Sequence, residues 1–166
     1  MTKEQVSVGV DPGKTGALSA IGDSCQRANI MPVIKGKAGG SKTELCIDGV
    51  NGWFDTLLED AVIKAVYIER QQAFPKQGGV SNFSTGDTYG MLKGIIRTRN
   101  FPMVIVGPRI WKAAILGGTK KDKVAAIQFC KNRYPLIDLD VGIRKTIYHD
   151  GMADAACIAT WGRMQA

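Results

Sequence analysis

The spacing of apolar and polar residues along the chain predicts five strands and four helices. Short apolar or alternating runs predict strands at residues 6–11, 17–21, 28–34, 65–69 and 103–106. Apolar positions at helical spacing and helix-boundary residues predict helices at about 48–61, 82–99, 119–133 and 151–163. The order is three strands, helix, strand, helix, strand and two helices. This order is typical of a mixed sheet flanked by helices, in the α/β class.

Capping and turn residues set the expected element boundaries. Asp48 is the expected N-cap of the first helix, and Thr119 that of the third. Proline and glycine make Asp11–Gly16 a turn, and the glycine- and lysine-rich segment 35–42 is expected to be a loop. No internal repeat or linker interrupts the pattern, so residues 1–166 are expected to form a single domain.

The composition narrows the functional classes. The 166 residues include 22 lysines and arginines against 15 aspartates and glutamates, a net charge of +7. Such a balance favours a polyanionic partner, of which nucleic acid is the first candidate. No stretch fits a signal peptide or a membrane span, so a soluble, cytoplasmic protein is expected. The four cysteines are scattered and the chain has one histidine, which argues against a zinc site.

Four acidic residues occur where one site could form. Asp11 ends the first predicted strand, Glu69 ends the fourth, and Asp150 and Asp154 lie one turn apart at the start of the last helix. Sites in open α/β sheets gather beyond the carboxyl ends of the strands. Each acid also has an ordinary explanation: a turn residue, a solvated strand end, or a favourable charge at a helix N-terminus.

A cluster of carboxylates predicts a metal ion. Like charges oppose ionisation of their neighbours, and a hard divalent cation removes that cost. Two Mg²⁺ ions roughly 4 Å apart activate water and stabilise the leaving oxygen in phosphodiester hydrolysis. The sequence therefore predicts that Asp11, Glu69, Asp150 and Asp154 bind two Mg²⁺ ions, for which Mn²⁺ is a possible substitute.

Basic and aromatic residues predict contacts with DNA. Three lysines fall in the expected first turn of the third helix, where amide groups and the helix dipole favour a bound phosphate. A glycine-containing loop after Glu69 carries an aromatic ring that could stack on bases or pack under its own loop. The candidate DNA-binding residues are Phe74, Lys76, Gln77, Lys112, Lys120, Lys121 and Lys123. The alternative for the lysines is a solvated helix surface.

Glycines at positions 86, 90 and 94 form a stripe along the second predicted helix. Each costs about 1 kcal/mol relative to alanine, so a close backbone approach is expected to compensate. The sheet of the same chain is the slightly favoured partner, and the same helix of a second subunit is the alternative.

Three segments resemble the acidic motifs of RuvC-type Holliday junction resolvases. They are Val8–Ala17, Tyr67–Gln71 and His149–Ala155, which together span nearly the whole chain in order. Residues 74–94, Trp111-Lys112 and Gly117–Lys120 resemble most the resolvases of bacteriophages.

The resemblance implies an RNase H-like fold with a five-stranded mixed sheet, three antiparallel strands followed by parallel ones. It implies a homodimer that makes paired, metal-dependent nicks in four-way DNA junctions, with no membrane and no small-molecule cofactor. Asp11, Glu69, Asp150 and Asp154 would be the catalytic, metal-binding acids. Lys120 and Lys123 would approach phosphates, and Phe74 would lie near the junction centre. A phage protein acting in the host cytoplasm is the implied source.

Some alternatives remain open. The spacing of the last two acids leaves a choice between His149 and Asp150 as metal ligand, and Asp150 is preferred because it shares a helix face with Asp154. The first motif also resembles the phosphate loop of actin-like ATPases, but 166 residues are too few for their two domains. The other candidates are a ribonuclease H, a nuclease that acts more broadly on branched DNA, and a non-catalytic DNA-binding module.

Overall fold

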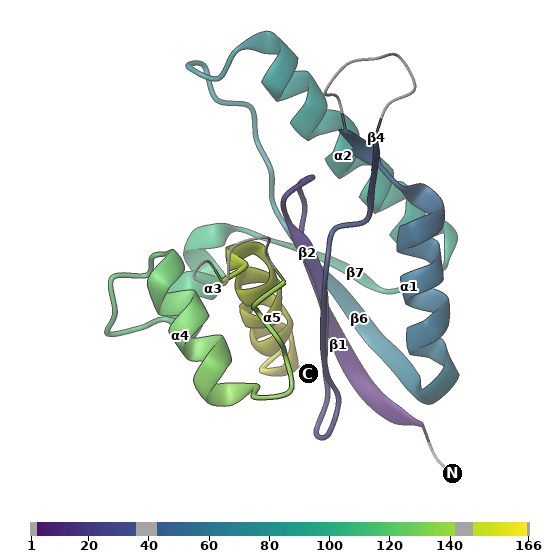
Figure 1. Cartoon of the computed structure of the whole chain (residues 1–166), viewed down its shortest axis with the longest axis vertical. Coiled ribbons are helices and arrows are strands. Elements are labelled where there is room, and N and C mark those ends of the chain that lie inside the picture. The colour runs from purple at the N-terminus through teal and green to yellow at the C-terminus, as the bar shows by residue number, and fades with distance from the viewer. Residues whose placement is uncertain (1–2, 36–42, 142–147, 166) are drawn as a thin grey trace.

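A five-stranded mixed sheet forms the centre of the computed structural model, which describes residues 3–35, 43–141 and 148–165. The strand order is β3-β2-β1-β6-β7. The strands of this sheet are β1 (Glu4–Asp11), β2 (Ala17–Ile21), β3 (Gln26–Ile30), β6 (Ala61–Glu69) and β7 (Met103–Val106). The first three are antiparallel, whereas β6 is parallel to β1 and β7 is parallel to β6. The predicted α/β mixed sheet is therefore confirmed (Figure 1).

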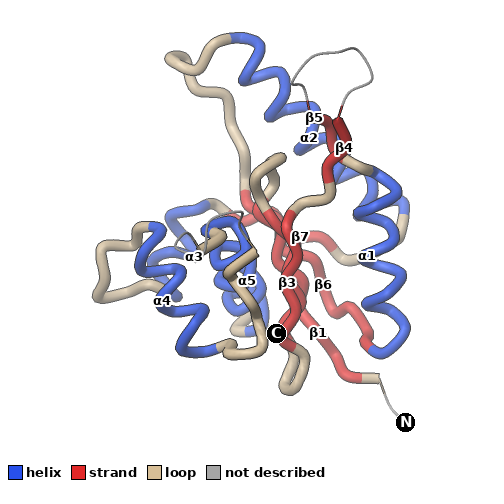
Figure 2. Tube along the Cα trace, viewed as in Figure 1, coloured by secondary structure: helices blue, strands red, loops and turns tan. Residues whose placement is uncertain are grey.

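Helices cover both faces of the sheet. They are α1 (Ile47–Asp60), α2 (Gly79–Thr98), α3 (Pro108–Ile115), α4 (Lys123–Arg133) and α5 (Asp150–Arg163). Figures 1 and 2 show α1 and α2 on one side of the strands and α3, α4 and α5 on the other. Each side has its own apolar core, one around Phe54 and Leu92 and the other around Trp111 and Ile158. None of the helices in the described part of the chain is both long and apolar enough to cross a bilayer.

Helix α5 packs closely against β1. A methyl group on Gly9 of β1 would collide with the backbone of Ala155 and Ala159 of α5. A methyl group on Gly162, near the other end of α5, would collide with the ring of Tyr67 on β6. Because α5 is also rich in alanine and largely buried, its backbone lies directly on the sheet.

The third strand differs from its prediction. The apolar run 28–34 does not form one strand: β3 ends at Ile30, and β4 (Val33–Lys35) begins after Pro32. Proline lacks the amide hydrogen that a strand interior needs. The short β4 pairs with β5 (Thr43–Leu45), which was not predicted, in a separate two-stranded sheet. Of the predicted loop at 35–42, residues 36–42 lie outside the described part of the chain.

Several boundaries were also predicted wrongly. Asp48 lies in the first turn of α1, and the N-cap is Cys46, whose Sγ accepts a hydrogen bond from the Gly49 amide. Ala61 begins β6 instead of ending the helix. Thr119 does not cap α4, because its hydroxyl donates to the Leu116 carbonyl, and the N-cap is Asp122.

The structure adds one helix that the sequence pattern did not predict. Gly107-Pro108 was expected only to close a strand, but Pro108 is the first residue of α3. Proline fits the first helical position because no intrahelical bond is required of its nitrogen there.

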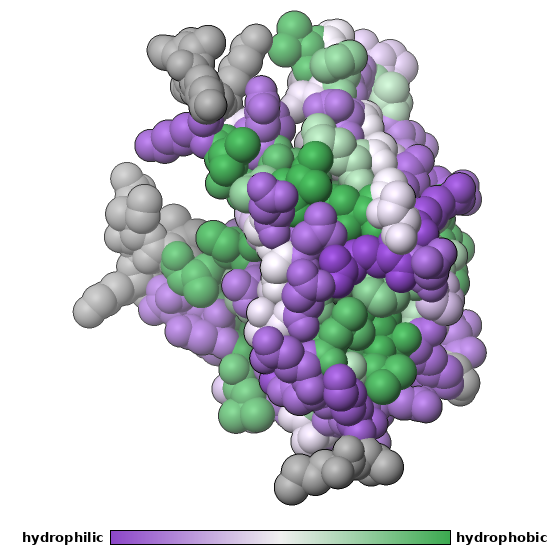
Figure 3. Space-filling view, turned by 90° about the vertical axis from the view of Figure 1, so that its right-hand side faces the viewer, coloured by the Kyte–Doolittle hydropathy of each residue, from purple (hydrophilic) through white to green (hydrophobic). Residues whose placement is uncertain are grey.

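The glycine stripe of α2 faces outward, so its expected contact with the chain's own sheet is wrong. A methyl group on Gly86, Gly90 or Gly94 would meet nothing within 4 Å. The buried face of α2 instead carries Thr88 and apolar residues such as Leu92. Figure 3, taken from the side of Figure 1 on which α1 lies, shows apolar patches separated by hydrophilic side chains.

Replacing Gly9 by alanine tests the contact between α5 and β1. We expect Gly9→Ala to lower the free energy of unfolding by about 1–3 kcal/mol, because the new methyl group overlaps backbone atoms that cannot rotate away. Gly52→Ala in α1 is the matched control, since a methyl group there meets nothing within 4 Å. The control should raise stability by roughly 0.5–1 kcal/mol through helix propensity. Urea unfolding measures both, and equal effects of the two variants would contradict the packing assignment.

Candidate active site

Two of the four predicted acids end adjacent parallel strands. Asp11 is the last residue of β1, and Glu69 is the last residue of β6. Val10 pairs with Ile68 in the register of these strands, so both carboxylates leave the sheet at the same edge.

The other two acids reach this edge on α5. Asp150 begins the helix and Asp154 lies one turn later. The helix approaches Asp11 closely at Gly151, where a methyl group would lie 2.8 Å from the Thr15 carbonyl oxygen and 3.1 Å from Oδ2 of Asp11. The structure therefore places all four predicted acids at one end of the sheet.

Burial and mutual repulsion perturb these carboxylates. Burial is the main cause that raises the pKa of Asp11 to about 7, and the charges of Glu69, Asp154 and Asp150 raise it further. Burial also raises the pKa of Asp154 to about 6, against the lowering effect of the Lys112 charge. For Glu69, burial raises the pKa and a hydrogen bond from Trp111 opposes the rise. The group thus resists carrying its full negative charge without a cation.

Asp150 differs from the other three acids because it has a basic partner. Its burial raises the pKa, but the hydrogen bond and charge of Lys123 outweigh that effect and the net pKa is lowered. The Lys123 ammonium, at the first residue of α4, forms an ion pair with the Asp150 carboxylate, at the first residue of α5. The adjacent His149 is the N-cap of α5, where its Nδ1 accepts a hydrogen bond of 3.1 Å from the Met152 amide.

The donor set suits a hard divalent cation. All four acids offer carboxylate oxygens, the ligands that Mg²⁺ and Mn²⁺ prefer. Oδ1 of Asp154 is buried and has no hydrogen-bond partner, so it is available to a ligand. Among the described residues, as their side chains are placed, no three such groups already form a closed metal-binding arrangement. The chemistry of the donors fits a metal, and the side chains would have to move to complete its coordination.

Helix α3 contributes two residues to this centre. Trp111 Nε1 donates a hydrogen bond of 2.7 Å to Oε2 of Glu69. The charge of Lys112 lowers the pKa of Asp11, Glu69 and Asp154. The sequence predicted the Trp111-Lys112 pair as a cation and an aromatic ring beside a phosphate site, and it predicted no contact between Trp111 and the acids. The available signal was the Trp-Lys pair itself, and it could not be placed because α3 was not predicted.

A cleft of about 820 Å³ opens from the acidic centre toward α2. One wall is the β1–β2 turn around Lys14, and the opposite wall is the first turns of α2, including Ser84 and Thr88. Asp11 and Glu69 also line it. The cleft is therefore continuous with the carboxylate group and large enough for part of a polymer substrate.

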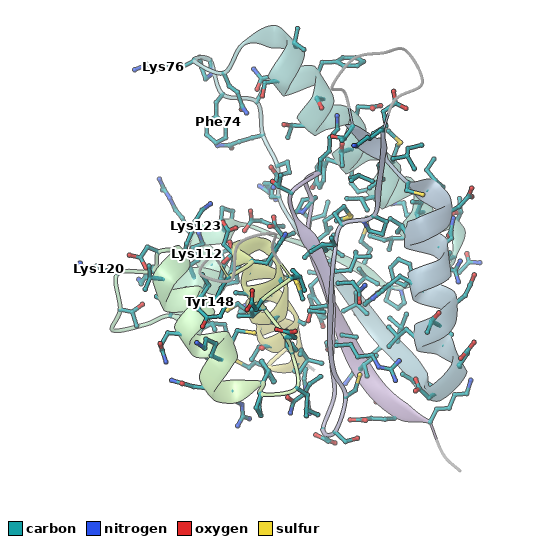
Figure 4. The ribbon with its side chains drawn as sticks, in the orientation of Figure 1. Phe74, Lys76, Lys112, Lys120, Lys123 and Tyr148 are labelled. Atoms are coloured by element: carbon teal, nitrogen blue, oxygen red, sulfur yellow. The ribbon has the colours of Figure 1, made fainter. Side chains whose placement is uncertain are left out.

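The candidate DNA-binding residues form two groups. Phe74, Lys76 and Gln77 lie on the loop between β6 and α2, and Phe74 is 53% exposed. Asn82 of α2 holds this loop, donating through Nδ2 to the carbonyls of Phe74 and Gln77 at 3.0 and 2.7 Å. Figure 4 shows Phe74 and Lys76 on the upper loop and Lys112, Lys120 and Lys123 below them on the same side of the molecule.

The lysine group is placed differently from its prediction. Lys120 and Lys121 precede α4 in an exposed loop, and only Lys123 lies in the first helical turn. Lys121 has a positive φ of 57°, and its amide donates to the Thr119 hydroxyl. The predicted placement of all three lysines in the first turn of the helix is therefore wrong, because Lys120 and Lys121 lie in the loop that leads into α4. The predicted contact of these lysines with phosphate stays a prediction.

The raised pKa values predict a pH dependence of stability. A carboxyl group whose pKa rises on folding binds its proton more tightly in the folded state, so its contribution is lost as pH rises. We expect the metal-free protein to lose stability between about pH 4 and pH 7, by at most about 1.4 kcal/mol per pH unit for each such group. Asp11→Asn should remove part of this loss and stabilise the protein at pH 8.

Urea unfolding with chelator at pH 5 and pH 8 measures the effect. Asp48→Asn, which neutralises an exposed carboxylate in α1, is the control. The Asp11 variant should gain stability over wild type mainly at pH 8. A gain of the same size at both pH values would show that the Asp11 carboxylate is not perturbed.

The chain is similar in structure to several solved proteins. No protein-family model and no curated protein sequence matches the chain. Among solved structures, RuvC of Thermus thermophilus in complex with a Holliday junction substrate is similar, with a TM-score of 0.56 at 18% identity over 96% of both chains. Another Thermus thermophilus RuvC structure gives a TM-score of 0.54 at 19% identity, again over 96% of both chains. The yeast mitochondrial Holliday junction resolvase Ydc2 gives 0.55 at 19% identity, covering 99% of this chain and 80% of that one.

These similarities extend along almost the whole chain. At such low sequence identity they establish the architecture. The predicted resemblance to RuvC-type resolvases is confirmed at this level: the chain has the RNase H-like fold found in RuvC and Ydc2.

Proposed function

We propose that this protein is a metal-dependent DNA endonuclease that resolves four-way junctions. The observation that carries the proposal is the convergence of Asp11, Glu69, Asp150 and Asp154 at one end of an RNase H-like sheet. The likeness to RuvC, whose structure is known with a Holliday junction substrate, supports the choice of substrate. The whole chain, residues 1–166, acts as a single nuclease domain.

The four acids are the proposed ligands of two Mg²⁺ ions, which Mn²⁺ can replace. Divalent ions bound there would supply a polarised water and neutralise charge at the phosphodiester. Asp150 is preferred to His149, because the His149 Nδ1 is engaged in capping α5. Lys112 places a positive charge beside the carboxylates from the α3 side and reduces their mutual repulsion.

The two basic groups would hold the DNA backbone on either side of the cleft. Lys120, Lys121 and Lys123 form the lower contact, and Lys123 must exchange its Asp150 partner for a phosphate to take part. Lys76 and Gln77 form the upper contact. The exposed ring of Phe74 is suited to stack against unpaired bases at the junction centre.

A homodimer is the proposed active form, because paired nicks in a symmetric junction need two active sites. The outward-facing glycine stripe of α2 supports this proposal, since it lets another backbone approach. Phe83 on the same helix is 76% exposed and supplies apolar surface for such a contact. Sedimentation at assay concentrations should give the mass of two chains, and a monomer alone would contradict the dimer.

We place the protein in a bacteriophage, acting in the host cytoplasm, on the resemblance of residues 74–94.

Junction cleavage tests the proposed activity. We expect paired nicks in a labelled four-way junction with Mg²⁺, and none with chelator or with Asp11→Asn. The variant should still bind the junction, because the lysines and Phe74 are unchanged. Asp48→Asn is the control that removes an exposed carboxylate of α1, which does not line the cleft, and should cut normally.

Linear duplex and an RNA–DNA hybrid serve as competing substrates. Cutting of the hybrid in place of the junction would indicate a ribonuclease H. Tight junction binding by wild type without any cutting would indicate a non-catalytic DNA-binding module.

Lys120→Ala tests the phosphate contact of the loop before α4. Binding of the junction should weaken for every sequence, and the slope of log affinity against log salt should fall by about 1. Lys64→Ala on β6 is the control, since Lys64 lies well before the carboxyl end of its strand. Filter binding at several salt concentrations measures both variants. An unchanged slope for Lys120→Ala would show that Lys120 is a solvated surface lysine that contacts no phosphate.

A further inference from the structure

We propose that Trp111 is a positioning residue that fixes the carboxylate of Glu69 for metal binding. The indole Nε1 donates to Oε2 of Glu69 at 2.7 Å, across 42 residues of sequence. The Trp111 side chain has no exposed surface and is the largest of the fully buried side chains. The inference rests on the proposed function, because it assigns Glu69 to a metal.

The burial of Trp111 makes its hydrogen bond directional. An indole N–H can only donate, and a buried donor without a partner costs free energy. The ring is packed in the core on the α5 side of the sheet, among Leu116, Ala126 and other buried residues. Because the ring cannot turn, the position of Oε2 is set by the position of the indole.

Glu69 has little else to hold its head group. Its other oxygen, Oε1, receives only a 3.4 Å contact from Nε2 of Gln71. A glutamate side chain has three rotatable bonds, so without Trp111 the carboxylate would sample several rotamers. With Oε2 held by the indole, Oε1 is the oxygen most free to meet a cation.

The backbone around these two residues forms a rigid frame. Glu69 pairs with Val106 in the parallel register, and the amide of the next residue, Arg70, donates to the Val106 carbonyl at 2.8 Å. Helix α3 begins directly after this contact, with Gly107 as N-cap and Pro108 as the first residue. The short link leaves α3 little freedom relative to the end of β6, so it can hold the indole accurately.

The other two tryptophans have a different role. Trp53 packs edge-on against Phe54, and Trp161 packs edge-on against Tyr67, each through its ring. Both are only partly buried. Replacing them by phenylalanine changes packing alone, which makes them matched controls for Trp111→Phe.

The closing experiment measures Mn²⁺ affinity of the DNA-free protein, by electron paramagnetic resonance of free Mn²⁺. Loss of a residue that orients a metal ligand typically weakens metal binding 10–100-fold. We expect Trp111→Phe to weaken Mn²⁺ binding roughly 10-fold or more, and Trp53→Phe and Trp161→Phe to leave it within about twofold. Thermal unfolding of the metal-free variants reports separately on packing. Equal Mn²⁺ affinity in all three variants would overturn the assignment.

Indole NMR signals of wild type provide a second measurement that does not depend on how Trp111→Phe folds. With ¹⁵N-labelled tryptophan, the Trp111 indole signal should move on addition of Mg²⁺ and again in Glu69→Gln, while those of Trp53 and Trp161 stay in place. An unchanged chemical shift of the Trp111 indole signal, both on addition of Mg²⁺ and in Glu69→Gln, would also overturn the assignment.

The outcomes separate this inference from the proposed nuclease. A wild-type chain that cuts junctions, with unaltered Mn²⁺ affinity in Trp111→Phe, would remove the role of Trp111 alone. A chain that cuts nothing, but whose Mn²⁺ binding depends on Trp111, would keep the positioning role and remove the nuclease. A wild-type chain that binds no Mn²⁺ and shows no Mg²⁺ response would contradict the positioning role, whatever its activity.

Discussion

Mutual repulsion among four carboxylates is the constraint on which the rest of the structure depends. Asp11 and Glu69 are brought together by adjacent parallel strands, which is an ordinary consequence of the sheet. Helix α5 brings Asp150 and Asp154 next to them, and the like charges of the carboxylates oppose that approach. The charges of Lys112 and Lys123 offset this repulsion only in part, because the pKa values of Asp11, Glu69 and Asp154 remain raised. Close packing of the alanine-rich helix α5 offsets this repulsion. Gly9 of β1 contacts the middle of the helix, and Gly151 at the start of the helix contacts Asp11 and the β1–β2 turn. The buried helix therefore both fills the apolar core and holds two of the four acids at the site.

The elements that carry the acids follow from local sequence. Val6–Asp11 and Ala65–Glu69 lie in apolar runs of strand length, and their ends could be located from the acid and the polar residues after it. That both ends meet at one edge follows from the general rule for parallel strands. The existence and type of these elements were therefore predictable, and the similar solved structures agree with the architecture.

Other features depend on information that short-range patterns do not contain. The helix α3 begins at a proline that also fits a strand end, so local signals did not distinguish the two. The cap of α1 is a cysteine sulfur, a weak acceptor that capping preferences do not favour. The spacing of Gly86, Gly90 and Gly94 shows that they share a face but not which way the face points. The bond between Trp111 and Glu69 joins two distant segments and emerges only when β7 and α3 are in place.

Asn82 gives the loop after β6 a mechanical property of its own. Its side-chain amide is bonded to the backbone of both Phe74 and Gln77, so the loop is fastened to the first turn of α2 at two points. The loop and the helix consequently move together as one unit. Any molecule that docks along the glycine face of α2 is therefore held at a set position relative to the backbone of Phe74. In a pair of chains joined along this face, the distance between the two Phe74 loops would be set by the helix contact, because neither loop moves independently of its helix.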